Sequence, residues 1–152
     1  MERERKFLVD RLPDDLGPAV AIRQGYLALD GNVQVRVRRA DNECTLTVKG
    51  GRGRDRTEVE TIITVEQFDD LWPLTEGRRI EKARHRVPLV DGRTAEVDLY
   101  SAAHAGLQVV EVEFPENADP DAFVPPPWFG RDVTDDARYS NADLATAGES
   151  PH

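Results

Sequence analysis

Two stretches decide the fold of this chain, Val35-Arg36-Val37-Arg38 and Val110-Glu111-Val112-Glu113, because each alternates apolar and charged residues. Successive side chains on a β-strand point to opposite faces, so the two charges of each stretch share one face and the valines share the other. The same period of two recurs in five further segments, around Glu2/Glu4, Thr47/Lys49, Glu58/Glu60, Lys82/Arg84 and Glu96/Asp98. The sequence therefore predicts a sheet with one densely charged face and one apolar face.

Turn signals such as Asp30-Gly31-Asn32 and Asp91-Gly92 separate the predicted strands. We expect eight of them, at roughly 2–9, 22–29, 33–39, 44–49, 57–63, 78–88, 94–100 and 108–114. One helix is expected after Thr64, which can form a capping box with Gln67, and another from about 140 to 147. We interpret residues 1–147 as one mainly β domain of the α+β kind, followed by a loose C-terminal tip at 148–152.

Bulk properties exclude several partners. The chain has 152 residues, 32% of them charged, and a net charge of -9. A surface this acidic repels nucleic acid and anionic membrane, so neither is an expected partner and any anion site must be a local concentration of bases. No stretch is long and apolar enough to span a bilayer, and the first residues are charged rather than typical of a signal peptide. We therefore expect a cytoplasmic protein.

Two closures of the sheet fit this pattern. The charged face could look into solvent while helices cover the apolar face, or the sheet could curl into a barrel with the charges inside and a few helices outside. The clustering of signs favours the barrel, since Glu111 and Glu113 are both acidic whereas Arg36 and Arg38 are both basic. Neighbouring carboxylates repel one another unless a cation joins them, and clustered arginines suit phosphate. Both clusters together indicate a complex of metal and polyphosphate.

The N-terminal Glu2-Arg3-Glu4-Arg5-Lys6 resembles the Glu-x-Glu-x-Lys signature of the CYTH superfamily, also called triphosphate tunnel metalloenzymes. The resemblance continues in order along the whole chain and is greatest to the short bacterial branch. Its motifs are Gln24-Gly25-Tyr26-Leu27, Arg36-x-Arg38, Thr47-Val48-Lys49, Glu58-x-Glu60, Glu81-Lys82-Ala83-Arg84, Glu96-x-Asp98, Glu111-Val112-Glu113-Phe114, Pro126-Pro127-Trp128-Phe129-Gly130 and Arg138-Tyr139-Ser140-Asn141. The resemblance implies a closed eight-stranded antiparallel β-barrel tunnel that hydrolyses or cyclises triphosphates with a divalent metal.

The resemblance also assigns roles. The implied metal ligands are Glu2, Glu4, Asp98, Glu111 and Glu113. The implied phosphate-binding residues are Lys6, Arg36, Arg38, Lys49, Lys82 and Arg84. The implied catalytic residues are Glu2, Glu4, Lys6 and Glu113. Glu58, Glu60 and Glu96 are implied as supporting residues. Alternatively, these three glutamates only form salt bridges on the strand face. The expected cofactor is Mg²⁺ or Mn²⁺, with two ions, because these hard cations prefer carboxylate and phosphate oxygens.

Several functions remain open on these grounds. The first is hydrolysis of inorganic tripolyphosphate, because no stretch of the sequence indicates a base-binding pocket. The alternatives are an adenylyl cyclase, a nucleoside triphosphatase, a thiamine triphosphatase or a non-catalytic polyphosphate-binding protein. The few expected helices cover little of the apolar outer face, so a homodimer is also an expected assembly.

Overall fold

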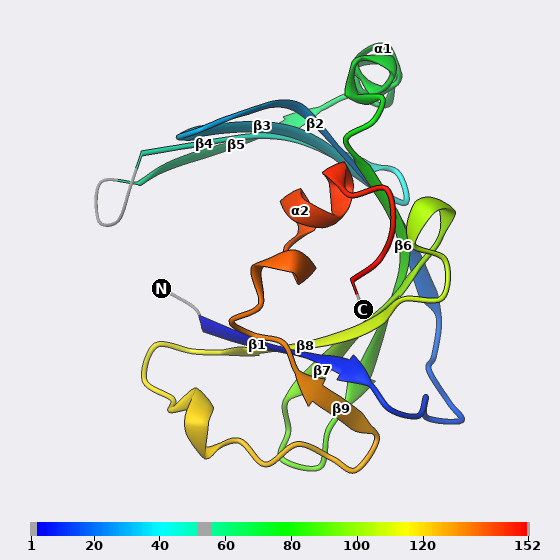
Figure 1. The fold of residues 1–152 in the computed structure, drawn as a ribbon, viewed down its shortest axis with the longest axis vertical. Helices are drawn as coiled ribbons and strands as arrows, with labels where there is room; N and C mark the ends of the chain where they lie inside the picture. The colour runs from blue at the N-terminus through cyan, green and yellow to red at the C-terminus, as the bar shows by residue number, and fades with distance from the viewer. Residues whose placement is uncertain (1–2, 52–55, 152) are drawn as a thin grey trace.

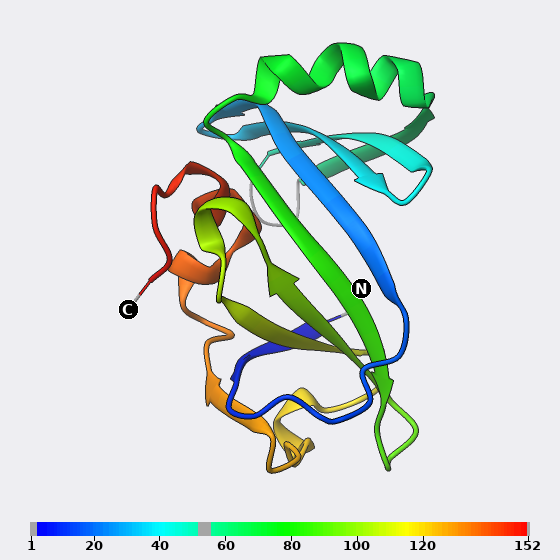
Figure 2. The ribbon, with the colours of Figure 1, turned by 90° about the vertical axis from the view of Figure 1, so that its right-hand side faces the viewer.

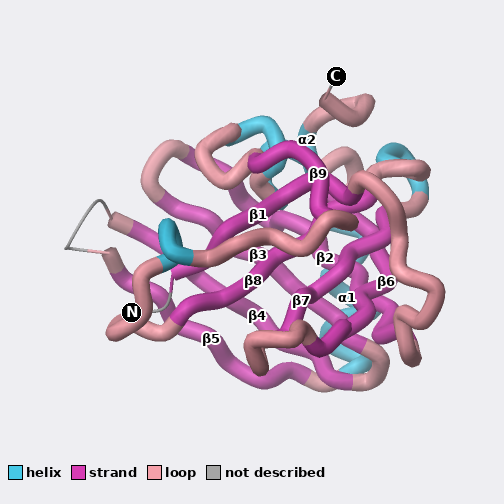
Figure 3. Tube along the Cα trace, turned by 90° about the horizontal axis from the view of Figure 1, so that it is seen from below, coloured by secondary structure: helices cyan, strands magenta, loops and turns pink. Residues whose placement is uncertain are grey.

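The structure is a computed structural model and describes residues 3–51 and 56–151. In this part of the chain, antiparallel strands form one sheet in the order β5-β4-β3-β2-β6-β7-β8-β1-β9. The strands are β1 (Arg3–Val9), β2 (Ala19–Asp30), β3 (Val33–Ala40), β4 (Glu43–Gly50), β5 (Thr57–Ile63), β6 (Arg79–Pro88), β7 (Thr94–Tyr100), β8 (Gln108–Phe114) and β9 (Phe129–Asp132). The mainly β, antiparallel class is confirmed. Figure 3 shows the few short helices among the strands.

The helix after Thr64 forms as its capping signal predicts. In α1 (Val65–Leu71), the Thr64 hydroxyl accepts a hydrogen bond from the Gln67 backbone, and the Gln67 side chain accepts one from the Thr64 backbone. Phe68 is buried against the outer face of the sheet and stacks on Trp72, with ring centroids 5.3 Å apart. A 3₁₀ turn, η2 (Trp72–Thr75), contains Pro73 and ends the helix.

The remaining helical turns lie in connections and near the C-terminus. They are the 3₁₀ turns η3 (Ala102–His104), η4 (Pro120–Ala122) and η5 (Ala137–Tyr139), and the α-helix α2 (Asn141–Thr146). Ser140 caps α2 by accepting a hydrogen bond from the Asp143 backbone. Among the described residues, no helix has the length and apolar character needed to cross a membrane.

The sheet is not closed, so the closed eight-stranded barrel is not confirmed. Its two edges are β5 and β9, as the strand order shows. The free edge of β1, which would have to meet β5 in a barrel, is taken by the segment around β9, with Val9 opposite Phe129 and a backbone bond from Val133 to Lys6. β9 is also a strand that the sequence analysis missed, because it is only four residues long and follows a run of prolines.

The sheet is strongly curved (Figure 1). Its two faces carry different residues. The outer face is apolar. Beneath α1 it carries Val37 and Cys44, and at the other end of the sheet Phe7, Val97, Val110 and Phe114 pack against Phe129. We call the opposite face, which carries Arg38, Lys82 and Glu111, the inner face. Figure 2 shows α1 lying against the outside of the sheet.

One predicted feature, a set of helices confined to the outside, is wrong for α2. This helix lies on the inner side of the curved sheet (Figure 1), and its Leu144 and Ala145 are buried there. The reason is that the inner face is not charged along its whole length. At one end it carries apolar and aromatic side chains that require cover, namely Leu8, Tyr26, Ile80, Tyr100 and Val109.

The buried His104 side chain, in η3, makes hydrogen-bond contacts with the C-terminal segment. Its Nδ1 lies 2.8 Å from the Ser150 hydroxyl and its Nε2 lies 2.5 Å from the Leu144 carbonyl oxygen. Ser150 belongs to the tip that was expected to be loose, so at least this residue has a specific contact. The division into one domain and a tip stays a prediction.

Candidate active site

The strand register brings together the predicted acids of the Glu-x-Glu-x-Lys motif on β1 and of the Glu111-Val112-Glu113-Phe114 motif on β8. Glu4 on β1 lies opposite Glu113 on β8, and Lys6 lies opposite Glu111. On the other side of β8, Glu111 lies opposite Glu96 of β7. Glu2, a further predicted metal ligand, lies outside the described residues. The sheet thus gathers four acids and one lysine from three adjacent strands on its inner face.

The acids in this cluster repel one another. Burial, and next the charge of Glu111, raise the pKa of Glu4, and Glu113 adds to the effect, whereas Lys6 opposes it. The Lys6 Nζ lies 3.3 Å from the Glu111 carboxylate and donates a hydrogen bond to the Tyr139 carbonyl oxygen at 3.0 Å. Lys6 therefore offsets part of the negative charge around Glu111, while the raised pKa of Glu4 reflects its burial and the repulsion from Glu111 and Glu113.

Asp98 is the centre of a buried ionic network on the inner face. Its carboxylate is completely buried and receives the Lys82 Nζ at 2.8 Å. The Arg84 guanidinium also grips it with two nitrogens, at 2.8 and 2.9 Å, and reaches Glu96 at 3.3 Å. Both oxygens of Asp98 are thus engaged by bases, and a metal role for Asp98 stays a prediction.

The network fixes the charge states of its members. Burial alone would raise the pKa of Asp98, but the hydrogen bonds from Arg84 and the charges of Lys82 and Arg84 outweigh it and lower that pKa. Burial likewise works against the charged form of Arg84, but its bonds to Asp98 prevail and raise its pKa. For Lys82 burial is the larger effect, and its pKa is lowered despite the attraction of Asp98.

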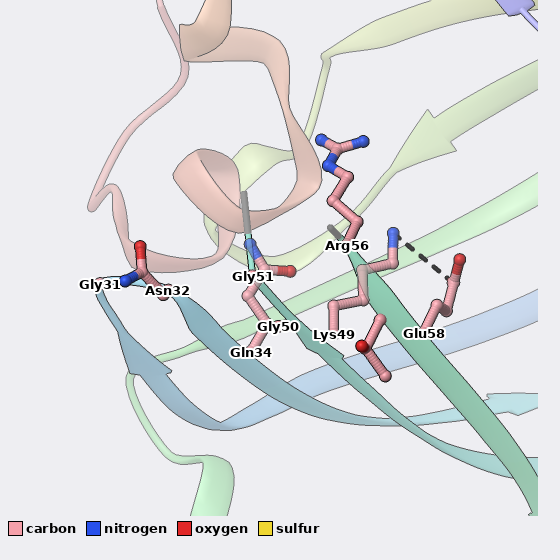
Figure 4. A pocket seen from close by; sticks show the side chains of 9 residues that line it. Gly31, Asn32, Gln34, Lys49, Gly50, Gly51, Arg56 and Glu58 are labelled. Atoms are coloured by element: carbon pink, nitrogen blue, oxygen red, sulfur yellow. Dashed lines mark ion pairs between the residues drawn. The ribbon is translucent and has the colours of Figure 1, made fainter. Parts of the chain in front are cut away.

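The predicted residues of β3, β4 and β5 form looser pairs. Lys49 lies 3.7 Å and Arg36 4.0 Å from the exposed Glu58 carboxylate, while the Thr47 hydroxyl donates to Glu60 at 3.2 Å. Figure 4 shows Lys49 and Glu58 reaching toward each other from neighbouring strands. Lys49 and Glu58 line a cavity of about 390 Å³ near the end of β4 and the start of β5. These bases are held only weakly and can exchange their partners for a ligand.

Arg38 differs from all the other bases on the inner face. Its Nε is buried, and it is the only such side-chain atom in the described part of the chain without a hydrogen-bond partner. Burial, and then the charges of Arg84 and Arg36, lower the pKa of Arg38. An unpaired buried donor costs free energy, so a half-buried guanidinium that carries such a donor, with Arg36 and Arg84 close enough to act on its charge, marks a place for an anion.

Arg38 and Arg84 also line an open, strongly polar cavity of about 680 Å³, together with Glu96 and Glu113. This cavity lies at the end of the inner face away from α2, because its residues on β7 and β8 are those farthest from Tyr100 and Val109. Predicted bases and predicted acids thus face one solvent-accessible space.

Sequence reasoning missed the contribution of the C-terminal segment. The Tyr139 carbonyl holds Lys6, and the Asn141 side chain accepts a hydrogen bond from the Tyr100 hydroxyl at 3.2 Å. The Lys82 Nζ lies 5.4 Å from the centre of the Tyr100 ring. Tyr139 and Asn141 belong to a motif that carried the family resemblance, but a backbone carbonyl leaves no signal in a sequence.

Metal-binding side chains are not fully assembled in the described part. Among residues 3–51 and 56–151, no three acidic, histidine or cysteine side chains are placed so that they could hold a metal ion. Glu4, Glu111 and Glu113 nevertheless supply hard oxygen donors on adjacent strands. Mg²⁺ is commonly bound by only one or two carboxylates together with substrate phosphates and water, so this donor set suits such an ion.

A curved antiparallel sheet whose inner face combines clustered carboxylates with an arginine whose buried Nε has no hydrogen-bond partner defines a class of protein that handles polyanions. No protein-family model matches the chain. Individual relatives do match. The chain is 46% identical over 145 residues to an inorganic triphosphatase of Nitrosomonas europaea, covering 95% of this chain and 96% of that protein. It is 40% identical over 147 residues to an inorganic triphosphatase of Acetivibrio thermocellus, covering 94% and 92%.

The fold agrees with these relatives. The crystal structure of an inorganic triphosphatase matches with a TM-score of 0.82 and 44% identity, over 97% of this chain and 95% of that one. The chain therefore belongs to the inorganic triphosphatase family.

Proposed function

We propose that this protein hydrolyses inorganic tripolyphosphate to pyrophosphate and phosphate with the help of a divalent metal ion, as a member of the CYTH superfamily. The observation that carries the proposal is the buried Arg38 Nε without a partner, which lines the same cavity as Glu113. A polyphosphate chain neutralised by a metal ion supplies the anion for the Arg38 guanidinium and a cation for the Glu113 carboxylate in one complex. The two relatives named inorganic triphosphatase support the choice of substrate.

The bases of the inner face divide into two groups by the way they are held. Lys82 and Arg84 are fixed on Asp98, so they present a rigid positive surface at the floor of the site. Arg36 and Lys49 form only long ion pairs with Glu58, and the Arg38 Nε has no hydrogen-bond partner. The two arginines can therefore donate paired hydrogen bonds to phosphoryl oxygens, and the lysine can approach them, when the substrate binds. We assign substrate binding to these five residues and Lys6.

The acids complete the site. Glu4, Glu111 and Glu113, with Glu2 as a further candidate, are the residues proposed to hold Mg²⁺ or Mn²⁺. Such an ion supplies charge neutralisation at the phosphoryl oxygens and lowers the pKa of a bound water. Glu58 and Glu96 orient the bases beside them, a role supported by the Lys49–Glu58 and Arg84–Glu96 contacts, and Glu60, which accepts a hydrogen bond from Thr47, is proposed as a further supporting residue. Two ions stay a prediction.

Hydrolysis of a phosphoanhydride bond by water does not require the protein to form a covalent bond with the substrate. Phosphoryl transfer is accelerated chiefly by positioning and by charge stabilisation of the transferring group. Arg38 on β3 and Arg84 on β6, the two strands that flank β2, line the same cavity and can both bind oxygens of one phosphate chain. Lys6, next to Glu111, can stabilise negative charge on the phosphoryl group nearest the acids.

The substrate assignment is tested by the rate of phosphate release from tripolyphosphate, ATP and thiamine triphosphate, with Mg²⁺ and with Mn²⁺. We expect tripolyphosphate to be cleaved much faster than either organic triphosphate. The lysines and arginines described above bind phosphates, and none of them recognises the organic group of the substrate. A preference for ATP, or formation of cyclic AMP, would move the assignment to a nucleotide-directed enzyme. Tight binding of tripolyphosphate without turnover would identify a binding protein.

Replacing Arg38 with alanine is expected to lower kcat/KM for tripolyphosphate about tenfold to a hundredfold. The physical reason is the loss of one charge-assisted contact to a phosphoryl oxygen, worth about 1.5–3 kcal/mol. The matched control is Arg39→Ala on the same strand, because Arg39 lies on the other face and bonds to Asp41 and Asn42 in the adjoining turn. Equal losses in both variants would show that the inner face has been misassigned.

The raised pKa of Glu4 predicts a metal-dependent acid limb. As pH falls, Glu4 takes up a proton at a higher pH than an ordinary glutamate, and the protonated carboxyl is a poor metal ligand. Metal and proton compete, so a higher Mg²⁺ concentration should move the acid limb of kcat/KM to lower pH. The profiles are measured at two Mg²⁺ concentrations, and superimposable acid limbs would contradict the assignment.

A further inference from the structure

One basic residue of the proposed site, Lys6, lies on β1, next to the edge of the sheet. Its ammonium lies 3.3 Å from the Glu111 carboxylate and donates to the Tyr139 carbonyl oxygen at 3.0 Å. An ammonium has three N–H donors, so one can be given to a phosphoryl oxygen while these two acceptors keep the side chain in place. A flexible four-carbon stem joins the ammonium to the backbone, so its position also depends on how firmly that backbone is held.

The backbone of Lys6 is held on the β9 side by two residues that follow this strand. The Val133 N–H donates to the Lys6 carbonyl oxygen at 2.9 Å, and the Lys6 N–H donates to the Thr134 hydroxyl oxygen at 3.0 Å. In the interior of a sheet, such an N–H is satisfied by a carbonyl oxygen of the next strand. Because β9 ends at Asp132, the threonine hydroxyl takes the place of that carbonyl.

The Thr134 hydroxyl is itself oriented by Asp132. The Asp132 Oδ1 accepts a hydrogen bond from this hydroxyl at 2.5 Å and one from the Thr134 N–H at 2.8 Å, while its Oδ2 accepts one from Arg5 at 2.7 Å. Burial alone would raise the pKa of Asp132, but the bonds from Thr134 and Arg5 outweigh it and lower that pKa. The hydroxyl proton is thus directed to a carboxylate, and the lone pairs of its oxygen remain available for the Lys6 N–H.

The same segment also reaches the other end of Lys6. After β9 the chain leads to η5 and then to α2 on the inner side of the sheet (Figure 1). Its turn is closed by the Asp136 N–H, which donates to the Val133 carbonyl oxygen at 3.0 Å. Residues 133–139 therefore contact Lys6 at its backbone, through Val133 and Thr134, and at its ammonium, through Tyr139.

We infer that Thr134, aligned by Asp132, is a positioning residue for Lys6 in the proposed reaction. Its hydroxyl fixes the Lys6 backbone at the edge of β1, and with it the reach of the ammonium toward the phosphoryl group nearest the acids of β1 and β8. No motif of the sequence analysis included Asp132 or Thr134. The inference rests on the proposed function, because that function gives Lys6 its role at the substrate.

The test is a double-mutant cycle between Thr134→Val and Lys6→Met, with kcat/KM for tripolyphosphate as the readout. In the wild-type background, loss of one hydrogen bond should lower kcat/KM about threefold to tenfold. In the Lys6→Met background, which lacks the ammonium to be positioned, the same substitution should change kcat/KM less than about 1.5-fold. Thr134→Ser keeps the hydroxyl and should stay within about twofold of the wild type.

Thr61→Val is the matched control for this cycle. Thr61 is exposed on β5, at the opposite edge of the sheet, and lies opposite Leu46 on the outer face. It should retain the wild-type kcat/KM. Equal losses from Thr134→Val in both backgrounds would show that Thr134 acts on the fold as a whole. That result would overturn the inference, as would an unchanged Thr134→Val or a Thr134→Ser variant that is equally impaired.

Hydrogen exchange of the Lys6 amide, followed by NMR without substrate, gives a readout that does not depend on activity. The exchange should accelerate about threefold to tenfold in Thr134→Val and stay slow in Thr134→Ser. Unchanged exchange in Thr134→Val would overturn the inference even if kcat/KM fell. A wild-type protein that fails to cleave tripolyphosphate would refute the proposed function, whereas the exchange rates would still decide whether Thr134 holds Lys6.

Discussion

Replacing Glu113 with glutamine is expected to lower kcat for tripolyphosphate at least about a hundredfold. The substitution keeps the shape of the side chain but removes a charge that faces Glu4 across β1 and β8. Loss of a metal ligand removes several kcal/mol of charge stabilisation in the transition state, and each 1.4 kcal/mol is worth a factor of ten. Glu4→Gln should behave in the same way. Steady-state kinetics over a range of Mg²⁺ concentrations measure the effect.

Glu66→Gln on α1 is the matched control, because Glu66 is exposed on the outer side of the sheet. It should retain wild-type rates. If Glu113→Gln kept near-normal turnover in saturating Mg²⁺, the acids of β1 and β8 would not be the metal ligands. Melting curves of both variants should match the wild type, since no substitution here removes a buried contact that holds the sheet together.

Replacing Asp98 with alanine is expected to reduce the free energy of unfolding by about 3–5 kcal/mol. The carboxylate is fully buried, and its removal leaves the Lys82 ammonium and the Arg84 guanidinium without their shared partner. An uncompensated buried charge is far more costly than the absence of the whole ion pair. Urea unfolding measures the difference, and Asp91→Ala, which removes an exposed carboxylate, should change the free energy by less than about 1 kcal/mol.

The double variant Asp98→Ala/Lys82→Met separates charge from packing. If the loss arises from the stranded charge, the second substitution should restore part of the stability, because it removes the buried ammonium. A double variant as unstable as the sum of the two single variants would show that Asp98 matters through packing alone.

Strand positions were predictable because the alternation of charged and apolar residues is long and regular. Arg36-x-Arg38 and Glu111-x-Glu113 place each charge on the inner face, and the register then pairs Glu4 with Glu113. What could not be predicted depends on contacts between distant segments. The four residues of β9 carry no periodic signal, yet their pairing with β1 decides that the sheet stays open.

The position of α2 shows the same limit. Its sequence reveals a short capped helix with Leu144 on one side, but not the surface that Leu144 covers. A signal did exist: Tyr26, Ile80 and Tyr100 share the strand parity of the charged residues, so part of the inner face had to be covered.

The most direct test of the central claim is the identity of the products formed from tripolyphosphate. Phosphorus NMR of a reaction with purified protein and Mg²⁺ follows all phosphate species at once. Cleavage at one end of the chain predicts that pyrophosphate and phosphate appear together in equal amounts, that no reaction occurs with the metal chelated, and that Glu113→Gln is inert. Tripolyphosphate that remains intact in the presence of Mg²⁺ or Mn²⁺, although the protein binds it, would contradict the account.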